Sequence, residues 1–150
     1  MRFPPGRFLS GDLRLKSGVA LWLDHGAELI ASGNPRDYEI RRPVERTPRG
    51  NWGSVFLLAE KAERVAILGS GVIRGGGLAK PRAQGQALEP FRPRLVAFEG
   101  CRDVLVNGVT LRDSDRWTLH FHHSDHVRAS ELRIVAAYDI FNTDGIDVDG

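Results

Sequence analysis

Short groups of alternating apolar and polar residues recur along the second half of the chain. In the clearest stretch the apolar positions form three such groups, Val96/Phe98, Val104/Val106 and Val109/Leu111. Alternation with a period of two predicts strands that turn one face inward. No window has the helical pattern of about 10–15 residues that a βαβ unit would need. The sequence therefore predicts an all-β fold built from short strands.

The same pattern returns after 23 residues, because segment 95–112 aligns without a gap on segment 118–135. Apolar residues then fall on apolar residues, for example Val96 on Leu119 and Leu111 on Ile134. A repeat of this length indicates a solenoid in which each turn covers the next. Three strands per turn, joined by short corners such as Asn107-Gly108, predict a parallel β-helix.

Looser copies of the turn extend the pattern in both directions. Towards the N-terminus the matching apolar groups are Val65, Ile67 and Ile73 in one turn and Val19, Leu21, Leu23, Ala27, Leu29 and Ala31 in another. Towards the C-terminus, Ile146 and Val148 should stack on Leu119 and Phe121, at a longer step of 27 residues.

Two insertions without strand or helix periodicity interrupt the turns, from Asn34 to Trp52 and from Gly75 to Arg94. Long loops on a repeat scaffold are usually functional or disordered. We expect these two to form the walls of a cleft.

A leucine-rich repeat is the second candidate fold, since Val106-x-x-Val109-x-Leu111 resembles its strand. Against it, Ser114 stands where that repeat expects asparagine. The Val96/Phe98 strand would also have no place in such a repeat. We favour the β-helix.

Composition and charge narrow the class of partner. The net charge of the 150-residue chain is only +2 and its basic residues are scattered, so we expect no nucleic-acid partner. A lone Cys101 excludes an internal disulfide and a cysteine-based zinc site. Residues 1–6 do not form a signal peptide, and no apolar run reaches membrane-spanning length, so we expect no membrane partner. The compartment stays open between secreted, periplasmic and cytoplasmic.

The candidate chemistry lies in segment 142–150, where Asp144, Asp147 and Asp149 fall within six residues. From these residues alone, Asp144 before Gly145 is best interpreted as a turn residue that bonds its own backbone. Alternation turns Ile146 and Val148 inward, so Asp147 and Asp149 face outward. We expect Asp149 to be plain solvated surface.

Four histidines lie close together shortly before this segment. Alternation places His120 and His122 outward on one strand, whereas His123 and His126 fall at a corner. Such an arrangement converges poorly on a tetrahedral metal, so we expect no metal site.

Segment Asn142–Asp147 resembles the Asn-Thr-Asp-Gly-x-Asp motif of glycoside hydrolase family 28, the polygalacturonases and related pectin-degrading enzymes. Further stretches that resemble the family in order are 5–11, 92–96, 108–112 and 117–120. The family's Gly-Asp-Asp, Gly-His-Gly and Arg-x-Lys motifs are absent, and residues 74–77 replace its usual Asp-Gly-x-Gly.

The resemblance implies a right-handed parallel β-helix and inverting hydrolysis of α-linked galacturonan or pectin, without cofactor or metal. It makes Asp144 catalytic, with a share in the general-base role, and places Asn142 and Asp147 in the motif. We expect Asn142, Asp147 and His120 to bind substrate, His120 because it would lie one coil below Asp147. Asn142 is explained equally well as a turn residue or as part of an asparagine ladder. The two carboxyl groups of an inverting glycosidase lie about 6.5–9.5 Å apart, which explains why partners of Asp144 would sit on other coils.

We therefore expect residues 1–150 to be a single β-helix domain truncated at both ends, monomeric and inactive alone, with catalytic coils beyond residue 150. The alternative is a non-catalytic solenoid that binds polysaccharide or protein along its coils. A β-helix lyase is a third possibility, but it would require a calcium-binding acidic cluster and a basic residue that we do not identify.

Overall fold

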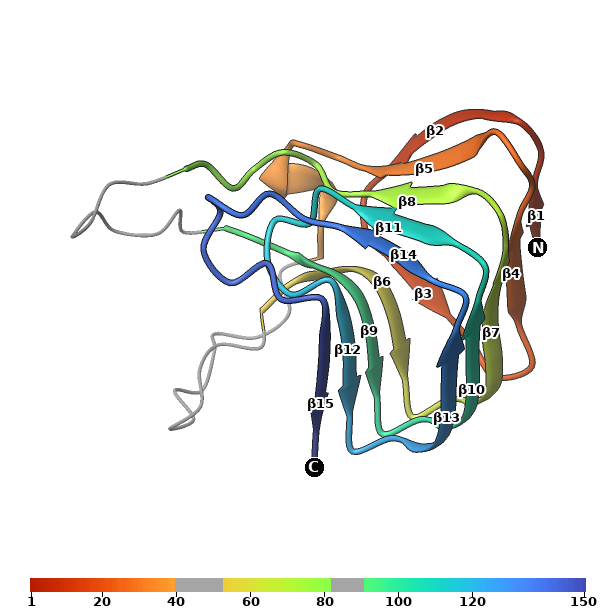
Figure 1. Cartoon of the computed structure of the whole chain (residues 1–150). Coiled ribbons are helices and arrows are strands. Elements are labelled where there is room, and N and C mark those ends of the chain that lie inside the picture. The colour runs from red at the N-terminus through yellow and green to blue at the C-terminus, as the bar shows by residue number, and fades with distance from the viewer. Residues whose placement is uncertain (40–52, 82–90) are drawn as a thin grey trace.

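A computed structural model describes residues 1–39, 53–81 and 91–150, and in these residues the chain winds into a parallel β-helix (Figure 1). Strands form every regular element except one short 3-10 helix, η1 (Pro35–Asp37), within the described ranges. Each turn passes through three sheets, and all the strand pairs in them are parallel. The predicted parallel β-helix is confirmed.

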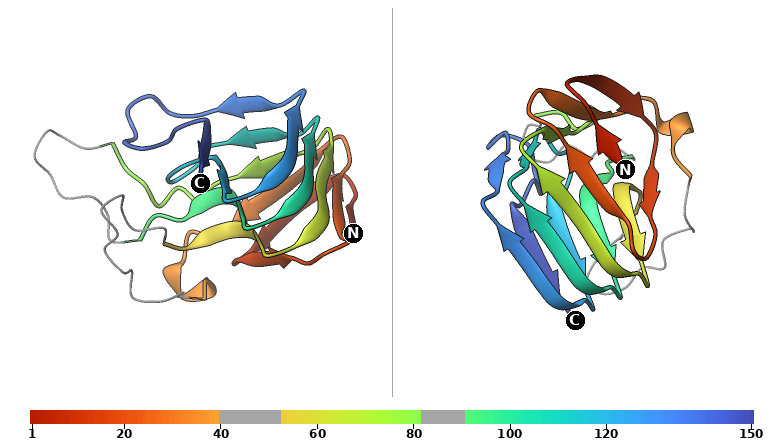
Figure 2. Two further views of the ribbon diagram at one scale, coloured as in Figure 1. Left: turned by 90° about the horizontal axis from the view of Figure 1, so that it is seen from below. Right: turned by 90° about the vertical axis from the view of Figure 1, so that its right-hand side faces the viewer.

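The strands of each sheet come from successive turns. Sheet A stacks β1 (Arg2–Phe3), β4 (Ala20–Leu23), β7 (Glu63–Gly69), β10 (Arg102–Asn107) and β13 (Asp125–Ser130). Sheet B stacks β2 (Gly6–Ser10), β5 (Ala27–Ala31), β8 (Val72–Arg74), β11 (Thr110–Arg112) and β14 (Arg133–Val135). Sheet C stacks β3 (Leu13–Leu15), β6 (Val55–Glu60), β9 (Arg94–Glu99), β12 (Leu119–His122) and β15 (Ile146–Asp149). Figure 2 shows the strands of sheet A side by side in this order.

The register is the one that the 23-residue repeat predicts. Val104 pairs with Val127, Leu111 with Ile134, and Val96 with Leu119. The earlier turns also align as expected, since Val65 pairs with Val104 and Ile73 with Leu111. Inward side chains of like kind therefore lie over one another along the axis of the helix.

The interior is filled by these stacked side chains. Phe98 and Phe121 lie one above the other, with ring centroids 5.4 Å apart and planes at 15°. Ile146 and Val148 continue the stack, as predicted, because they pair with Leu119 and Phe121. They are nevertheless 49% and 77% exposed, since no described strand lies over β15.

Strand β6 escaped the sequence analysis because its apolar run does not alternate. Leu57 and Ala59 join the interior, whereas Val55 and Leu58 form a separate small cluster with Ala97 on the outer face of sheet C. Apolar side chains on both faces remove the period-two signal.

The corner that follows β6, β9 and β12 of sheet C requires a left-handed backbone. Lys61 (φ 48°), Gly100 (φ 61°) and His123 (φ 46°) occupy this corner in three successive turns. Glycine adopts such a conformation freely and other residues seldom do. Of these three residues, only Gly100 therefore indicates the corner from its residue type.

The corner between sheets B and C carries all the long connections. Both predicted insertions leave from it, as do segments 113–118 and 136–145, at the left of Figure 1. The central parts of the insertions, 40–52 and 82–90, lie outside the described residues, so their predicted role as cleft walls stays a prediction. No helix in the described part of the chain is long and apolar enough to cross a membrane.

The stacked core predicts a large cost for Phe121→Ala. The ring is buried and in contact with Phe98, so its removal should lower the free energy of unfolding by roughly 3–5 kcal/mol. Denaturant unfolding measures the loss, and Tyr138→Ala, at a fully exposed corner residue, is the control with an expected change within about 0.5 kcal/mol. A loss under about 1 kcal/mol for Phe121→Ala would contradict the register.

Candidate active site

Asp144 ends a corner that is held by hydrogen bonds to backbone carbonyls. The hydroxyl of Thr143 donates to the carbonyls of Ala137 (3.2 Å) and Ile140 (3.0 Å). The amide of Thr118 donates to the carbonyl of Asp144 (2.9 Å), which ties the corner to the turn below. The Asp144 side chain is exposed, and its carboxylate has no hydrogen-bond partner within the described ranges. The simple turn interpretation, in which this carboxylate bonds its own backbone, therefore has no support in the structure.

Asn142 lies two residues earlier with a left-handed backbone (φ 57°). Asparagine adopts this conformation more readily than most residues, so the corner alone explains its presence. The side chain is half-buried. A role for Asn142 in substrate binding stays a prediction.

Asp147 and Asp149 project from β15 onto the outer face of sheet C. In the register of the sheet Asp147 pairs with His120 and Asp149 with His122. Four side chains of two adjacent strands thus lie on one face, beside the exposed carboxylate of Asp144.

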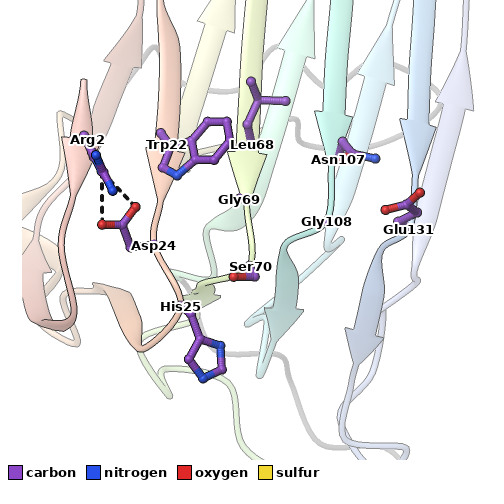
Figure 3. A pocket seen from close by; sticks show the side chains of 10 residues that line it. All are labelled: Arg2, Trp22, Asp24, His25, Leu68, Gly69, Ser70, Asn107, Gly108 and Glu131. Atoms are coloured by element: carbon purple, nitrogen blue, oxygen red, sulfur yellow. Dashed lines mark hydrogen bonds and ion pairs between the residues drawn. The ribbon is translucent and has the colours of Figure 1, made fainter.

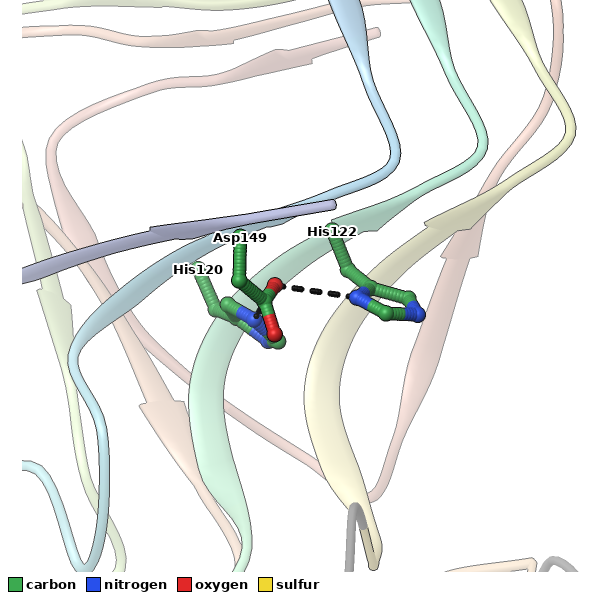
Figure 4. Close-up of side chains that lie close together, drawn as sticks. All are labelled: His120, His122 and Asp149. Atoms are coloured by element: carbon green, nitrogen blue, oxygen red, sulfur yellow. Dashed lines mark hydrogen bonds and ion pairs between the residues drawn. The ribbon is translucent and has the colours of Figure 1, made fainter. Parts of the chain in front are cut away.

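A chain of hydrogen bonds links β12 and β15 to β9. Figure 4 shows the part of it that joins His120, His122 and Asp149. Nη1 of Arg94 lies 2.6 Å from Nδ1 of His120, and Nη2 of Arg94 donates to Glu99 at 2.6 Å. Nε2 of His120 and Nδ1 of His122 both lie 2.9 Å from the same oxygen, Oδ1 of Asp149. Arg94 and His120 are buried, so this network is held by its surroundings.

The network fixes the proton positions. A guanidinium can only donate, so Nδ1 of His120 must accept from Arg94. Burial lowers the pKa of His120, which keeps the ring neutral and leaves its single proton on Nε2, where it donates to Asp149. Nδ1 of His122 likewise donates to Asp149, because a carboxylate only accepts. Burial alone would raise the pKa of Asp149, but the hydrogen bonds from His122 and His120 outweigh it and the net pKa is lowered.

Asp149 is therefore no plain surface residue, and that expectation is wrong. The signal was present in the sequence, since His120 and His122 share a face and the repeat places Asp149 over them. The buried Arg94 could not be inferred, because it stands at the start of a strand where alternation assigns no face.

The same three side chains raise the question of a cation. Ligand atoms of His120, His122 and Asp149 lie within 4.8 Å of one another. In the tautomer that Arg94 imposes, however, Nε2 of His120 carries a proton and has no lone pair for a metal. These hydrogen bonds therefore favour one interpretation of the three residues. They form a network that orients Asp149, rather than a metal centre.

Asp147 is a carboxyl group whose surroundings disfavour its charged form. Its Oδ2 is buried and has no hydrogen-bond partner in the described part of the chain. Burial, followed by the charges of Asp144 and Asp149, raises the pKa of Asp147 to about 6, although Arg116 and Arg94 act in the opposite direction. A group of this kind can hold a proton in mildly acidic solution or accept a hydrogen bond from a ligand.

Asp115 anchors the loops around the site. It is 2% exposed and accepts from the amides of Gly76 (3.0 Å) and Ala79 (2.7 Å). Arg92 donates to the carbonyls of Asp115 (2.7 Å) and Phe141. The described ends of the second insertion are thereby bound to the corner that carries Asp144.

A separate hollow of about 700 Å³ lies at the corner between sheets A and B (Figure 3). Trp22 forms part of its floor, and Arg2 forms an ion pair with Asp24 at its edge (2.9 Å). Basic and acidic groups are mixed here, with His25 and Glu131 also in the lining. The hollow therefore has no charge that would select one class of ligand, and it shares no residue with the Asp144 site.

The sequence model of glycosyl hydrolases family 28 matches residues 44–150. The chain belongs to this family.

Individual proteins that are similar to this chain are consistent with this family. A probable polygalacturonase of Vitis vinifera is 29% identical over 153 residues, which covers 97% of this chain and 31% of that protein. A polygalacturonase of Ralstonia nicotianae is 38% identical over 147 residues, covering 85% of this chain and 28% of that protein. The solved structure of the polygalacturonase from Erwinia carotovora ssp. carotovora superposes with a TM-score of 0.78 at 27% identity, over 95% of this chain and 42% of that chain.

The fold in this comparison is the right-handed parallel β-helix that the sequence predicts. The chain spans about a third of the length of the curated relatives that it matches. Activity and substrate are accordingly matters of proposal.

The raised pKa of Asp147 makes a direct prediction. A carbon-13 NMR titration of its carboxyl group should have a midpoint at about pH 6, and Asp144→Asn should lower that midpoint because it removes one of the repelling charges. A midpoint below 4, or no response to Asp144→Asn, would contradict the described environment.

The raised pKa of Asp147 also predicts how the stability of the protein changes with pH. Between about pH 4 and 6 the folded protein holds a proton that the unfolded chain has already lost, so the contribution of Asp147 to the free energy of unfolding declines as the pH rises through this range. Asp147→Asn should remove this decline.

Proposed function

We propose that this chain carries part of the active site of a glycoside hydrolase that cleaves galacturonan or another pectin polymer by inversion. The observation that carries the proposal is the exposed, unbonded carboxylate of Asp144 on a family 28 β-helix. The relatives named as polygalacturonases support the substrate class.

Asp144 suits the role of general base. An inverting glycosidase needs a carboxylate to activate water and a carboxylic acid, on the opposite face of the sugar, to protonate the leaving oxygen. The corner around Thr143 holds the backbone of Asp144 in place while leaving its side chain open to a water molecule. Asp144 thus has a fixed backbone and a carboxylate that is accessible to act as a base.

The acid must come from elsewhere. Asp147 and Asp149 follow Asp144 on one strand and project to the same side, so they would meet a bound sugar from one face only. Ile146 and Val148 point inward but are exposed, and a further coil on β15 would bury them. We propose that such a coil supplies the acid.

The remaining predicted residues then divide into two kinds. Asp147 is half-buried, and its Oδ2 is buried without a partner in the described residues. We propose that a rotation of the side chain presents this oxygen to a sugar hydroxyl, which fits a binding role. His120 is fully buried with a hydrogen bond on each ring nitrogen, so a direct contact with substrate would require the loss of one of them. We propose that His120 acts by orienting Asp149.

Asp144→Asn tests the proposal in the protein with its β-helix complete. The amide keeps the shape of the side chain but cannot take a proton from water. Loss of a general base should lower kcat on polygalacturonate by about 10²–10⁴ and leave KM nearly unchanged. Release of reducing ends is the measurement.

The matched control is Asp139→Asn, an exposed aspartate in the same corner. Asp149 is unsuitable as a control, because its replacement would break the histidine network. Near-normal kcat for Asp144→Asn, or an equal loss for Asp139→Asn, would refute the assignment. An absence of turnover by the wild-type protein, together with binding of the polymer, would favour a non-catalytic solenoid.

A further inference from the structure

The hollow at the corner between sheets A and B extends across all five strands of sheet A (Figure 3). One row of outward residues runs along it, one from each strand, in the register Arg2, Trp22, Leu68, Asn107 and Ser130. Adjacent parallel strands lie about 4.8 Å apart, so this row is about 19 Å long. The hollow therefore has the length for a short chain of linked units.

Glycines keep the middle of the hollow free of side chains. Gly69 (φ 110°) and Gly108 (φ 80°) line it in adjacent turns, directly after the row. A Cβ at Gly69 would collide with the carbonyl oxygen of Leu23, and a Cβ at Gly108 would collide with the carbonyl oxygen of Gly69. Because these neighbours are backbone atoms, no larger residue fits without moving a strand. The depression is thus a built-in feature of this corner.

The centre of the row is apolar. Trp22 is 46% exposed although Leu21 and Leu23 on either side of it are buried, so its indole lies on the outer face. The side chain of Leu68 lies beside it on the next strand (Figure 3). An exposed tryptophan offers a large apolar face and one N–H donor at its edge. It therefore suits a ligand that has an apolar face and polar edges.

Hydrogen-bonding side chains surround this apolar centre. Asn107 donates to the hydroxyl of Ser130 (3.0 Å), which holds the amide in place. The side chains of His25, Ser70 and Glu131 also line the hollow, and none of the three makes a hydrogen bond with another described residue. These groups can exchange hydrogen bonds with the hydroxyls of a ligand.

The lining offers no free positive charge that would hold an acidic ligand. Its guanidinium, on Arg2, is already paired with Asp24 at 2.9 Å. Glu131 adds a carboxyl group at the other end of the hollow. A polyanion would meet this like charge, whereas an uncharged ligand would not.

We propose that this hollow binds a short stretch of an uncharged polysaccharide, with one pyranose ring stacked on Trp22. A pyranose ring has a face of C–H groups and a rim of hydroxyls, which matches the apolar centre and polar surround of the hollow. The site goes beyond the proposed function, since it lies at a different corner from Asp144 and takes a neutral ligand. A polymer with neutral and acidic stretches would be held at two places, which strengthens its overall binding.

The test follows the indole N–H signal of Trp22 by NMR in the protein with its β-helix complete. Cellotetraose and galactotetraose are the neutral probes, tetragalacturonate is the acidic comparison, and loss of the signal in Trp22→Phe assigns it. At least one neutral probe should shift the signal to saturation and bind about tenfold or more tightly than the acid. By calorimetry, Trp22→Ala should weaken that probe about tenfold or more, and Trp22→Phe should retain most of the affinity.

Leu9→Ala is the matched control, because Leu9 is an exposed apolar residue on β2, outside the hollow. It should bind as the wild type does, and so should Asp144→Asn, which separates this site from the catalytic corner. The titration of the wild-type protein does not depend on whether a variant folds. No saturable shift with either neutral probe, equal or tighter binding of tetragalacturonate, or unchanged affinity in Trp22→Ala would each overturn the inference. A Trp22 signal that moves with protein concentration in the absence of sugar would also overturn it, by identifying the hollow as a contact between copies of the chain.

Discussion

Everything in this structure depends on one turn of the chain stacking in register on the next. The inward residues of sheet C, among them Phe98 and Phe121, lie directly over one another, and parallel hydrogen bonds hold the strands in that alignment. Because a strand alternates its faces, a fixed inner stack also fixes the outer row. The packing of the core therefore places His120 and His122 beneath Asp147 and Asp149, where the hydrogen bonds to Asp149 can form.

The ionisable side chains on the outer face of sheet C are regularly spaced, but their surroundings differ. Arg94 is buried on β9 and fixes the tautomer of His120, and His120 and His122 together keep Asp149 ionised. Asp147 receives no such support and its pKa rises to about 6. Two carboxyl groups two residues apart thus differ in pKa, because the histidines donate to Asp149 whereas burial and the neighbouring carboxylates act on Asp147. Differences of this kind are typical of sites that handle protons.

The sequence predicted the parts of the fold that repeat. The 23-residue shift gave the strands from Arg94 to Val135 and their register, because interior residues must match from turn to turn. Strand β6 was missed since its apolar residues serve both the interior and the outer cluster with Ala97. Corner positions such as Lys61 and His123 gave no signal, because their left-handed backbone is imposed by the strands on either side.

The sequence nominated Asp144 as a catalytic residue because it belongs to a motif, and that role stays a prediction. It could not point to Arg94 and Asp115, because their contacts run across turns. The account is tested most directly by the configuration of the first product. Proton NMR of polygalacturonate hydrolysis by the protein with its β-helix complete should show the β-anomer of the new reducing end before mutarotation, as inversion of an α-linkage requires. An α-anomer formed first, or an unsaturated sugar produced by elimination, would contradict it.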